Sequence, residues 1–121
     1  MRKIVVLTVV GAVILLSAFL IFSRIAQSRR EAAYQSAMAP FQRDLRAGTD
    51  RPDVKKYLDS HGVKYHSVRY GGSDASTLEI EIGEEPPRNL WCEESYVYIA
   101  LEFTAEEKLQ QVHIRKIGTC L

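Results

Sequence analysis

The stretch at residues 95–117, SYVYIALEFTAEEKLQQVHIRKI, has the pattern of two strands joined by a turn. Apolar side chains recur at every second position from Val97 to Phe103, and again at Val112 and Ile114. A period of two places successive side chains on opposite faces of a sheet. The polar run TAEEK separates the two halves, so we expect an antiparallel hairpin with one face toward a core.

Two further strands are expected before this hairpin. Residues 77–83 alternate cleanly, with Leu78, Ile80 and Ile82 on one face, whereas residues 63–70 are strand-like but alternate poorly. The run GGSDAS between them is typical of a turn. The consecutive prolines that follow, within EEPPRNLW, predict a loop because proline cannot donate to a sheet ladder.

Residues 49–62 predict a ten-residue amphipathic helix. Thr49 or Asp50 can cap its start, Pro52 suits the first turn, and Asp53 places negative charge at the positive end of the helix dipole. The buried stripe and the end of this helix are predicted at Val54, Tyr57, Leu58 and Gly62.

A second helical spacing of apolar side chains precedes this helix, from Tyr34 to Leu45. Pro40 interrupts it, because proline removes one backbone donor and disfavours helical angles at the residue before it. We therefore expect a helix to about Met38, a kink or break, and a short helix from Pro40 to Ala47.

The N-terminal part of the chain contains an uncharged apolar run from Ile4 to Phe22. As a helix it spans roughly 28 Å, close to the hydrocarbon thickness of a bilayer. A buried core helix is disfavoured because so small a domain cannot enclose a helix that is apolar on every side. A cleaved signal peptide is the stronger rival, but its apolar region is usually about 7–15 residues long and ends at small residues. The lipid bilayer is thus an expected partner, through an uncleaved anchor.

Charged residues are distributed unevenly along the sequence. Five of the 16 basic residues lie at or before Arg30, and all 15 acidic residues lie at or after Glu31. The C-terminal domain is therefore acidic and lacks the clustered Lys and Arg that phosphate backbones require. Nucleic acid is not an expected partner.

Basic residues on the two sides of the apolar run almost balance, so the positive-inside rule alone does not set its orientation. A short basic amino end, Arg2 and Lys3, is typical of a cytoplasmic N-terminus. Both cysteines lie in the C-terminal domain, where an oxidising compartment would let them pair. We expect a single-pass membrane protein whose N-terminus is cytoplasmic and whose C-terminal domain is extracytoplasmic.

These patterns predict three parts: a transmembrane anchor (1–25), a juxtamembrane helix or linker (26–39) and a small extracytoplasmic domain (40–121). The expected fold class is α+β. An N-terminal transmembrane helix precedes a two-layer domain of two helices and a three- to four-stranded antiparallel sheet.

The apolar residues of the hairpin define two registers that differ by one residue. One matches Ile99 with Ile114, and the other matches Phe103 with Leu109, so a bulge near residues 110–111 is needed to reconcile them. In the first register Cys120 faces Glu93, and in the second it faces Cys92 directly.

Either register brings the two cysteines within one residue of each other at the open end of the hairpin. Antiparallel neighbours lie about 4.5–5.5 Å apart, within the range that a disulfide spans. We therefore expect a Cys92–Cys120 disulfide, which would stabilise the domain by roughly 3.5 kcal/mol in the chain-entropy model.

Catalytic and metal sites are weakly supported alternatives. A cysteine nucleophile would need one of the three histidines as its base, and these occur singly, at His61, His66 and His113. No C-x-x-C or H-x-x-x-H spacing indicates zinc. No catalytic, cofactor-binding or metal residue is therefore expected.

The sheet face opposite the core is expected to be open to water and to form a protein-recognition surface, because tyrosine and arginine are enriched at such surfaces. Its expected members are Glu79, Glu81, Tyr96, Tyr98, His113 and Arg115. An ordinary exposed strand face, in which aromatic residues serve only as strand formers, is the alternative.

The segment LRAGTDRPDVKKYLDSHGVKY resembles the SmpA/OmlA-type domain of BamE-like envelope lipoproteins, through Gly48, Thr49, Val54 and Leu58. The chain departs from that family because it has no lipid-acceptor cysteine and has LDSHG in place of an LG-x-P turn. More broadly, it is similar to small bacterial membrane proteins with one anchor and one short domain. The resemblance implies a helix–helix–sheet topology, an envelope location and a non-catalytic binding or scaffold role.

The expected function is thus a membrane-anchored binding or scaffold domain for a protein partner. Two alternatives remain. One is a small Cys/His-dependent enzyme that faces a reducing compartment, and the other is a secreted inhibitor or ligand released by signal cleavage.

Overall fold

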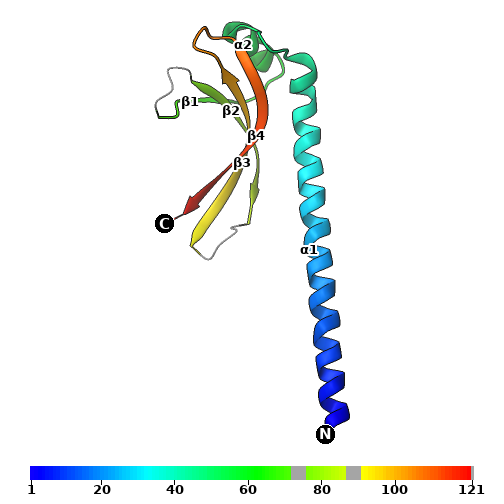
Figure 1. Ribbon diagram of the computed structural model, residues 1–121. Helices are drawn as coiled ribbons and strands as arrows, with labels where there is room; N and C mark the ends of the chain where they lie inside the picture. The colour runs from blue at the N-terminus through cyan, green and yellow to red at the C-terminus, as the bar shows by residue number, and fades with distance from the viewer. Residues whose placement is uncertain (72–75, 87–90, 121) are drawn as a thin grey trace. The chain divides into compact units, whose positions relative to one another are not determined.

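The computed structural model describes residues 1–71, 76–86 and 91–120, and only the backbone of residues 92, 93 and 120. The predicted turn at 71–76, the predicted loop at 84–91 and the cysteine side chains thus lie partly or wholly outside the described residues. Two helices precede four strands (Figure 1): α1 (Arg2–Asp44), α2 (Arg51–Ser60), β1 (His66–Val68), β2 (Thr77–Glu85), β3 (Cys92–Phe103) and β4 (Leu109–Cys120). The α+β class is confirmed.

The N-terminal part of α1 is apolar on every side and is not covered by protein. Its large apolar side chains from Ile4 to Ile25 are 48–73% exposed, and none of its most hydrophobic window is buried. The core helix of a soluble domain buries its apolar side chains, so this helix is not of that kind. It is long and apolar enough to cross a membrane, and a signal sequence has the same properties.

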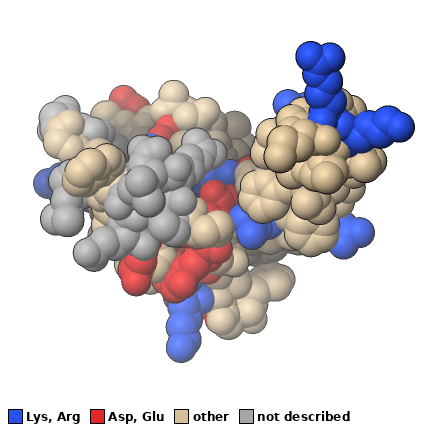
Figure 2. All heavy atoms as spheres, turned by 90° about the horizontal axis from the view of Figure 1, so that it is seen from below, with Lys and Arg blue, Asp and Glu red and all other residues tan. Residues whose placement is uncertain are grey.

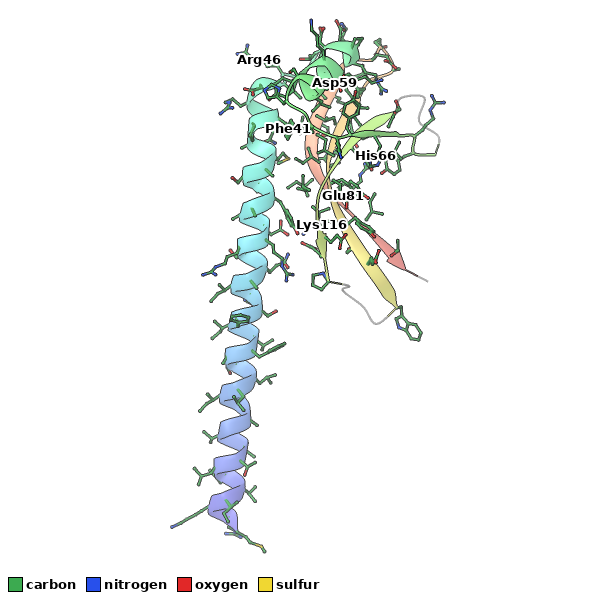
Figure 3. All side chains as sticks on the ribbon, turned by 180° about the vertical axis from the view of Figure 1, so that it is seen from behind. Phe41, Arg46, Asp59, His66, Glu81 and Lys116 are labelled. Atoms are coloured by element: carbon green, nitrogen blue, oxygen red, sulfur yellow. The ribbon has the colours of Figure 1, made fainter. Side chains whose placement is uncertain are left out.

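A break at Pro40 is wrong, because α1 continues through this residue and ends at Asp44, before the predicted Ala47. The alternative of a kink at Pro40 stays a prediction. Proline in a helix interior costs about 3 kcal/mol through its lost N–H and its clash with the preceding turn. Packing of the residues on both sides of Pro40 compensates for this cost: Met38 and Leu45 belong to the hydrophobic core, and Phe41 packs against it. Phe41, labelled in Figure 3, also contacts the Tyr57 ring edge-on. The two ring centroids lie 6.3 Å apart.

Helix α2 has the predicted length and buried stripe. Pro52 lies in its first turn, Val54 and Leu58 are fully buried, and Gly62 follows its end with φ +65°. This left-handed conformation carries a steric cost for residues with a Cβ, so glycine is suited to ending the helix.

The predicted side-chain cap of α2 is not formed. The Asp50 carboxylate accepts from Lys108 Nζ at 2.6 Å, and Thr49 Oγ1 donates to the Arg46 carbonyl. The start of the helix is held by the β3–β4 turn instead, because Arg51 N donates to the Glu107 carbonyl at 3.0 Å.

The four strands form an antiparallel meander in the order β1-β2-β3-β4. Strand β1 has three residues and is shorter than the predicted 63–70, consistent with its poor alternation. Strand β2 continues past the predicted 77–83 into Glu84 and Glu85, which were predicted as loop. Strands β3 and β4 have 12 residues each and extend beyond the predicted 95–103 and 109–117. Apolar alternation marks only the part of a strand that faces the core. It therefore underestimates the length of a strand that continues beyond the core.

The register of β3 against β4 follows the apolar pattern. Ile99 pairs with Ile114, whereas Phe103 pairs with Leu109 after a one-residue shift. Gln110 is the extra residue, which confirms the predicted bulge. A second shift near the start of β3 places Glu93 as an extra residue on that strand.

The core lies between one sheet face and the helical segments of the Ser36–Leu121 unit. Every second residue of β3 is almost fully buried, from Val97 to Phe103. The core consists of Met38, Leu45, Val54, Leu58, Leu78, Ile80, Ile99, Leu101, Phe103 and Leu109. The expected two-layer arrangement of helix and sheet is thus observed.

Arg51 is a buried charged residue that links three segments. Its guanidinium donates to the side-chain and carbonyl oxygens of Ser76, lies 4.5 Å from the Phe103 ring centroid, and approaches Glu107 Oε2 at 3.3 Å through Nε. The Nε contact is an ion pair without hydrogen-bond alignment. The planar guanidinium group has several N–H donors and can make these contacts at the same time. One side chain therefore links α2 to the start of β2 and to the β3–β4 turn.

Replacing Leu58 with alanine should lower the free energy of unfolding by about 2–5 kcal/mol, because a fully buried leucine leaves a cavity when truncated. Lys56→Ala, on the exposed side of the same helix, is the matched control and should stay within about 0.5 kcal/mol. Urea denaturation followed by circular dichroism measures both. Equal losses in the two variants would contradict the described core.

Candidate functional site: the polar face of the sheet

The sheet face opposite the core carries polar and aromatic residues in rows across the strands. Glu81 pairs with Tyr98, which pairs with Arg115, and the adjacent row crosses Glu79, Ala100 and His113. These positions alternate with the buried residues of each strand, so all six predicted members share one face. We name as the polar face His66, Glu79, Glu81, Tyr96, Tyr98, Glu102, His113 and Arg115.

Glu79 does not present its carboxylate to water, contrary to the sequence expectation. It is 1% exposed, accepts from the Tyr70 hydroxyl, and lies 3.3 Å from His66 Nε2 and 3.7 Å from Arg115 Nη1. A buried carboxylate is tolerated when cations and hydrogen-bond donors surround it. Tyr70, just beyond β1, therefore converts a surface position into a buried one.

Arg115 is the centre of this network. Its Nη2 donates to Glu102 Oε1 at 3.0 Å, and its guanidinium carbon lies 4.2 Å from the Tyr70 ring centroid. Glu102 also lies 3.7 Å from His113 Nε2. Together with Glu79 these contacts cross all four strands, so the network fixes the sheet as well as lining its surface.

His66, Tyr70 and Glu102 were not predicted as members of the site. His66 lies in a strand that alternates poorly, and Tyr70 lies outside any strand. Glu102 and Arg115 lie in the predicted hairpin and on the same face, but Glu102 pairs with Gln111 and Arg115 pairs with Tyr98, four residues away along β3. The register alone therefore did not indicate their ion pair.

The aromatic members of the polar face are half-buried. The Tyr98 ring meets His66 edge-on at 5.6 Å and lies 6.4 Å from the Tyr96 ring. His66 and Glu81, labelled in Figure 3, flank this part of the sheet from β1 and β2. Ordered rings with part of their surface accessible are suited to contact a protein partner at low entropic cost.

Tyr96 lies in an acidic environment. Its hydroxyl donates to the Glu94 carboxylate, and this hydrogen bond, with desolvation and the charges of Glu94, Glu84 and Glu81, raises the pKa of Tyr96 to about 12. Figure 2 shows Asp and Glu side chains grouped on the sheet domain. A basic partner would therefore meet a favourable potential beside Tyr96.

The backbone of the hairpin pairs Cys92 with Cys120. This pairing is the second of the two predicted registers, reached because Glu93 is bulged out of the ladder. The side chains lie outside the described atoms, so the disulfide stays a prediction that the backbone register supports.

The strand histidines lie far from this pair. His66 and His113 share the row that crosses β3 at Ala100, eight residues from Cys92. At about 3.3 Å per residue the separation is about 26 Å, whereas a nucleophile and its base must lie about 3 Å apart. A Cys92–His66 or Cys92–His113 catalytic pair within one chain is thus inconsistent with the sheet.

The remaining histidine also has other contacts. The His61 ring lies 4.2 Å from the Tyr57 ring, and its Nδ1 is 2.8 Å from the Tyr57 carbonyl oxygen. Among the residues that the structure describes, no three His, Cys, Asp or Glu side chains converge as a metal site.

No family model, curated protein or solved structure matches this chain. The function is therefore argued from the site.

Cys92→Ser and Cys120→Ser should each destabilise the protein by about 2–4 kcal/mol, and the double variant should be no less stable than either. The reason is that one bond is lost in all three cases. Thermal unfolding under non-reducing conditions measures this, with maleimide trapping before and after reduction as the direct test of the bond. Additive losses, or labelling of both thiols without reduction, would contradict the pairing.

The stability of the Tyr96→Phe variant should change less between pH 10 and 12 than the stability of the unmodified protein. The pKa of Tyr96 in the folded protein, about 12, exceeds the ordinary value of 10, so the folded state holds this proton more strongly. Its stabilising contribution is complete below pH 10 and is lost as pH rises toward 12. The stability difference between protein and variant, measured by urea midpoints, should narrow across this interval. A constant difference would show that Tyr96 titrates normally.

Proposed function

We propose that this chain is a single-pass membrane protein that displays a non-catalytic binding domain. The observation that carries the proposal is the apolar length of α1 from Ile4 to Phe22, whose large side chains are exposed and, among the described residues, are buried by no other segment. Exposing this area to water is unfavourable by about 25 cal/mol per Å², and a bilayer removes that cost. The bilayer is thus the first proposed partner.

The proposed orientation places the N-terminus in the cytoplasm and the C-terminal domain outside it. Arg2 and Lys3 at the amino end support it, and so does the backbone pairing of the two cysteines, which an oxidising compartment would convert into a covalent link. The BamE-like resemblance implies the same location and a scaffold role.

The proposed binding surface is the exposed part of the polar face, around Tyr96, Tyr98 and Glu81. The network of Glu79 and Arg115 holds these strands in place, which suits a preformed surface rather than one that orders on binding. The carboxylates around Tyr96 favour a basic protein partner.

The anchor is tested by the intact mass and extraction behaviour of the native protein. We expect residues 1–25 to be retained and the protein to stay in membranes after alkaline carbonate extraction, because a spanning helix is not released by salt or pH. Protease added outside spheroplasts should degrade the C-terminal domain. A mature protein that lacks residues 1–25 would support the secreted ligand instead.

The binding surface is tested by a photo-crosslinking residue at position 96 in intact cells. A discrete protein adduct is expected at position 96 and should weaken when Glu81→Lys reverses one of the acidic charges beside it. Lys56, exposed on α2, is the control position. Equal adducts at positions 56 and 96, insensitive to Glu81→Lys, would contradict a specific site on the polar face.

A further inference from the structure

Strand β4 forms one edge of the sheet and pairs only with β3 among the described strands. It has 12 residues, whereas the opposite edge, β1, has three. An edge strand presents a row of backbone N–H and C=O groups without ladder partners and can accept another strand. The long edge is therefore the one to consider for strand addition.

The start of β4 is already covered on this side. Leu109 N donates to the Thr49 carbonyl at 2.8 Å, and Gly48 N donates to the Leu109 carbonyl at 2.7 Å. Beyond this point the described backbone of the Ser36–Leu121 unit contributes no such partner on the outer side of the strand. We name residues 111–117 the open edge.

A groove lies where this cover ends. One side is formed by Gln42, Leu45 and Ala47, and the other by β4 from Leu109 to Val112, including the bulged Gln110. Its volume is about 220 Å³, below the roughly 300 Å³ at which pockets for small-molecule ligands begin. It is thus suited to one side chain of an adjacent extended segment.

The side chains of the open edge alternate in character. His113 and Arg115 lie on the polar face, whereas Val112 and Ile114 lie on the core face and are only half-buried. An added strand that carries aliphatic residues on the core side would complete their burial. The gain is about 25 cal/mol per Å² of apolar area covered.

Charge selects the other side chains of the added strand. Strand β4 contains no acidic residue, and the carboxylates that neutralise Arg115 belong to β2 and β3. An added strand would lie about 5 Å from β4 and about 10 Å from β3. The charged side chains nearest to it are therefore the basic ones of β4, not the carboxylates of β2 and β3. A second copy of β4 would set basic side chains against basic side chains, which disfavours self-pairing.

We propose that the open edge accepts, by strand addition, an extended segment of another protein that alternates acidic and aliphatic residues. The acidic residues lie beside His113 and Arg115, and the aliphatic residues cover Ile114 and enter the groove. Lys116, on the core face and paired with Glu85 at 3.1 Å, limits the length of apolar segment that fits. This site adjoins the surface around Tyr96, because Tyr98 pairs with Arg115 and Tyr96 with Ile117. It takes a segment of the opposite charge, and it does not depend on the membrane orientation.

The test uses the isotope-labelled full chain in zwitterionic micelles and a short synthetic peptide that alternates glutamate and leucine. Its addition should shift the amide resonances of the open edge and of Ala47 and should slow their hydrogen exchange, because new backbone hydrogen bonds form there. A peptide of the same length that alternates lysine and leucine is the control and should bind at least about tenfold more weakly.

A groove variant separates strand addition from general charge attraction. Ala47→Phe fills the groove and should weaken the glutamate–leucine peptide by about tenfold, because its aliphatic side chain loses a buried site. Ala105→Phe, in the β3–β4 turn, is the matched control and should leave affinity unchanged.

Three outcomes would overturn the proposal. The first is equal affinity for the two peptides, and the second is a set of shifts centred on Glu81 and Tyr96 instead of the open edge. The third is slow exchange of the open edge in the absence of peptide, in a particle with the mass of a dimer. The last result would assign the edge to a second copy of this chain.

Discussion

The pairing of β3 with β4 is the constraint on which the rest of the domain depends. In this register Ile99 pairs with Ile114. The apolar side chains then lie on the core side of the sheet, and the residues of the polar face lie together on the other side. A slip by one residue would exchange the two faces. The bulges at Gln110 and Glu93 absorb the mismatch at each end, so the apolar match at the centre coexists with the backbone match of the cysteines.

Much of this arrangement was predictable, because alternation and turn chemistry are local. The α2 stripe and the bulge near Gln110 follow from spacing, and the six residues expected on the polar face do share it. The continuous α1 was not predictable from local rules, since the cost of Pro40 is offset by packing of Met38 and Leu45 against segments remote in sequence. Tertiary contacts overrode a local signal there.

The burial of Glu79 on the polar face was not predicted, for a related reason. Glu79 looked exposed because it alternates with Leu78 and Ile80, yet Tyr70 and Arg115 enclose its carboxylate. Arg51 is likewise only 7% exposed, although nothing in its local sequence at the start of a helix indicates burial. Alternation gives the direction of a side chain, whereas burial depends on what the remainder of the chain places above it.

The contacts of α2 with the β3–β4 turn have a consequence for the order of folding. Asp50 meets Lys108, which lies 58 residues further along the chain. Synthesis proceeds from the N-terminus, so the buried face of α2 stays uncovered until nearly all of the polypeptide has emerged. Contacts between distant segments also slow folding, because a long loop must close before they form. Completion of the last strand is thus the event that commits this domain to its native state, and a chain that stops short of it lacks one side of its core.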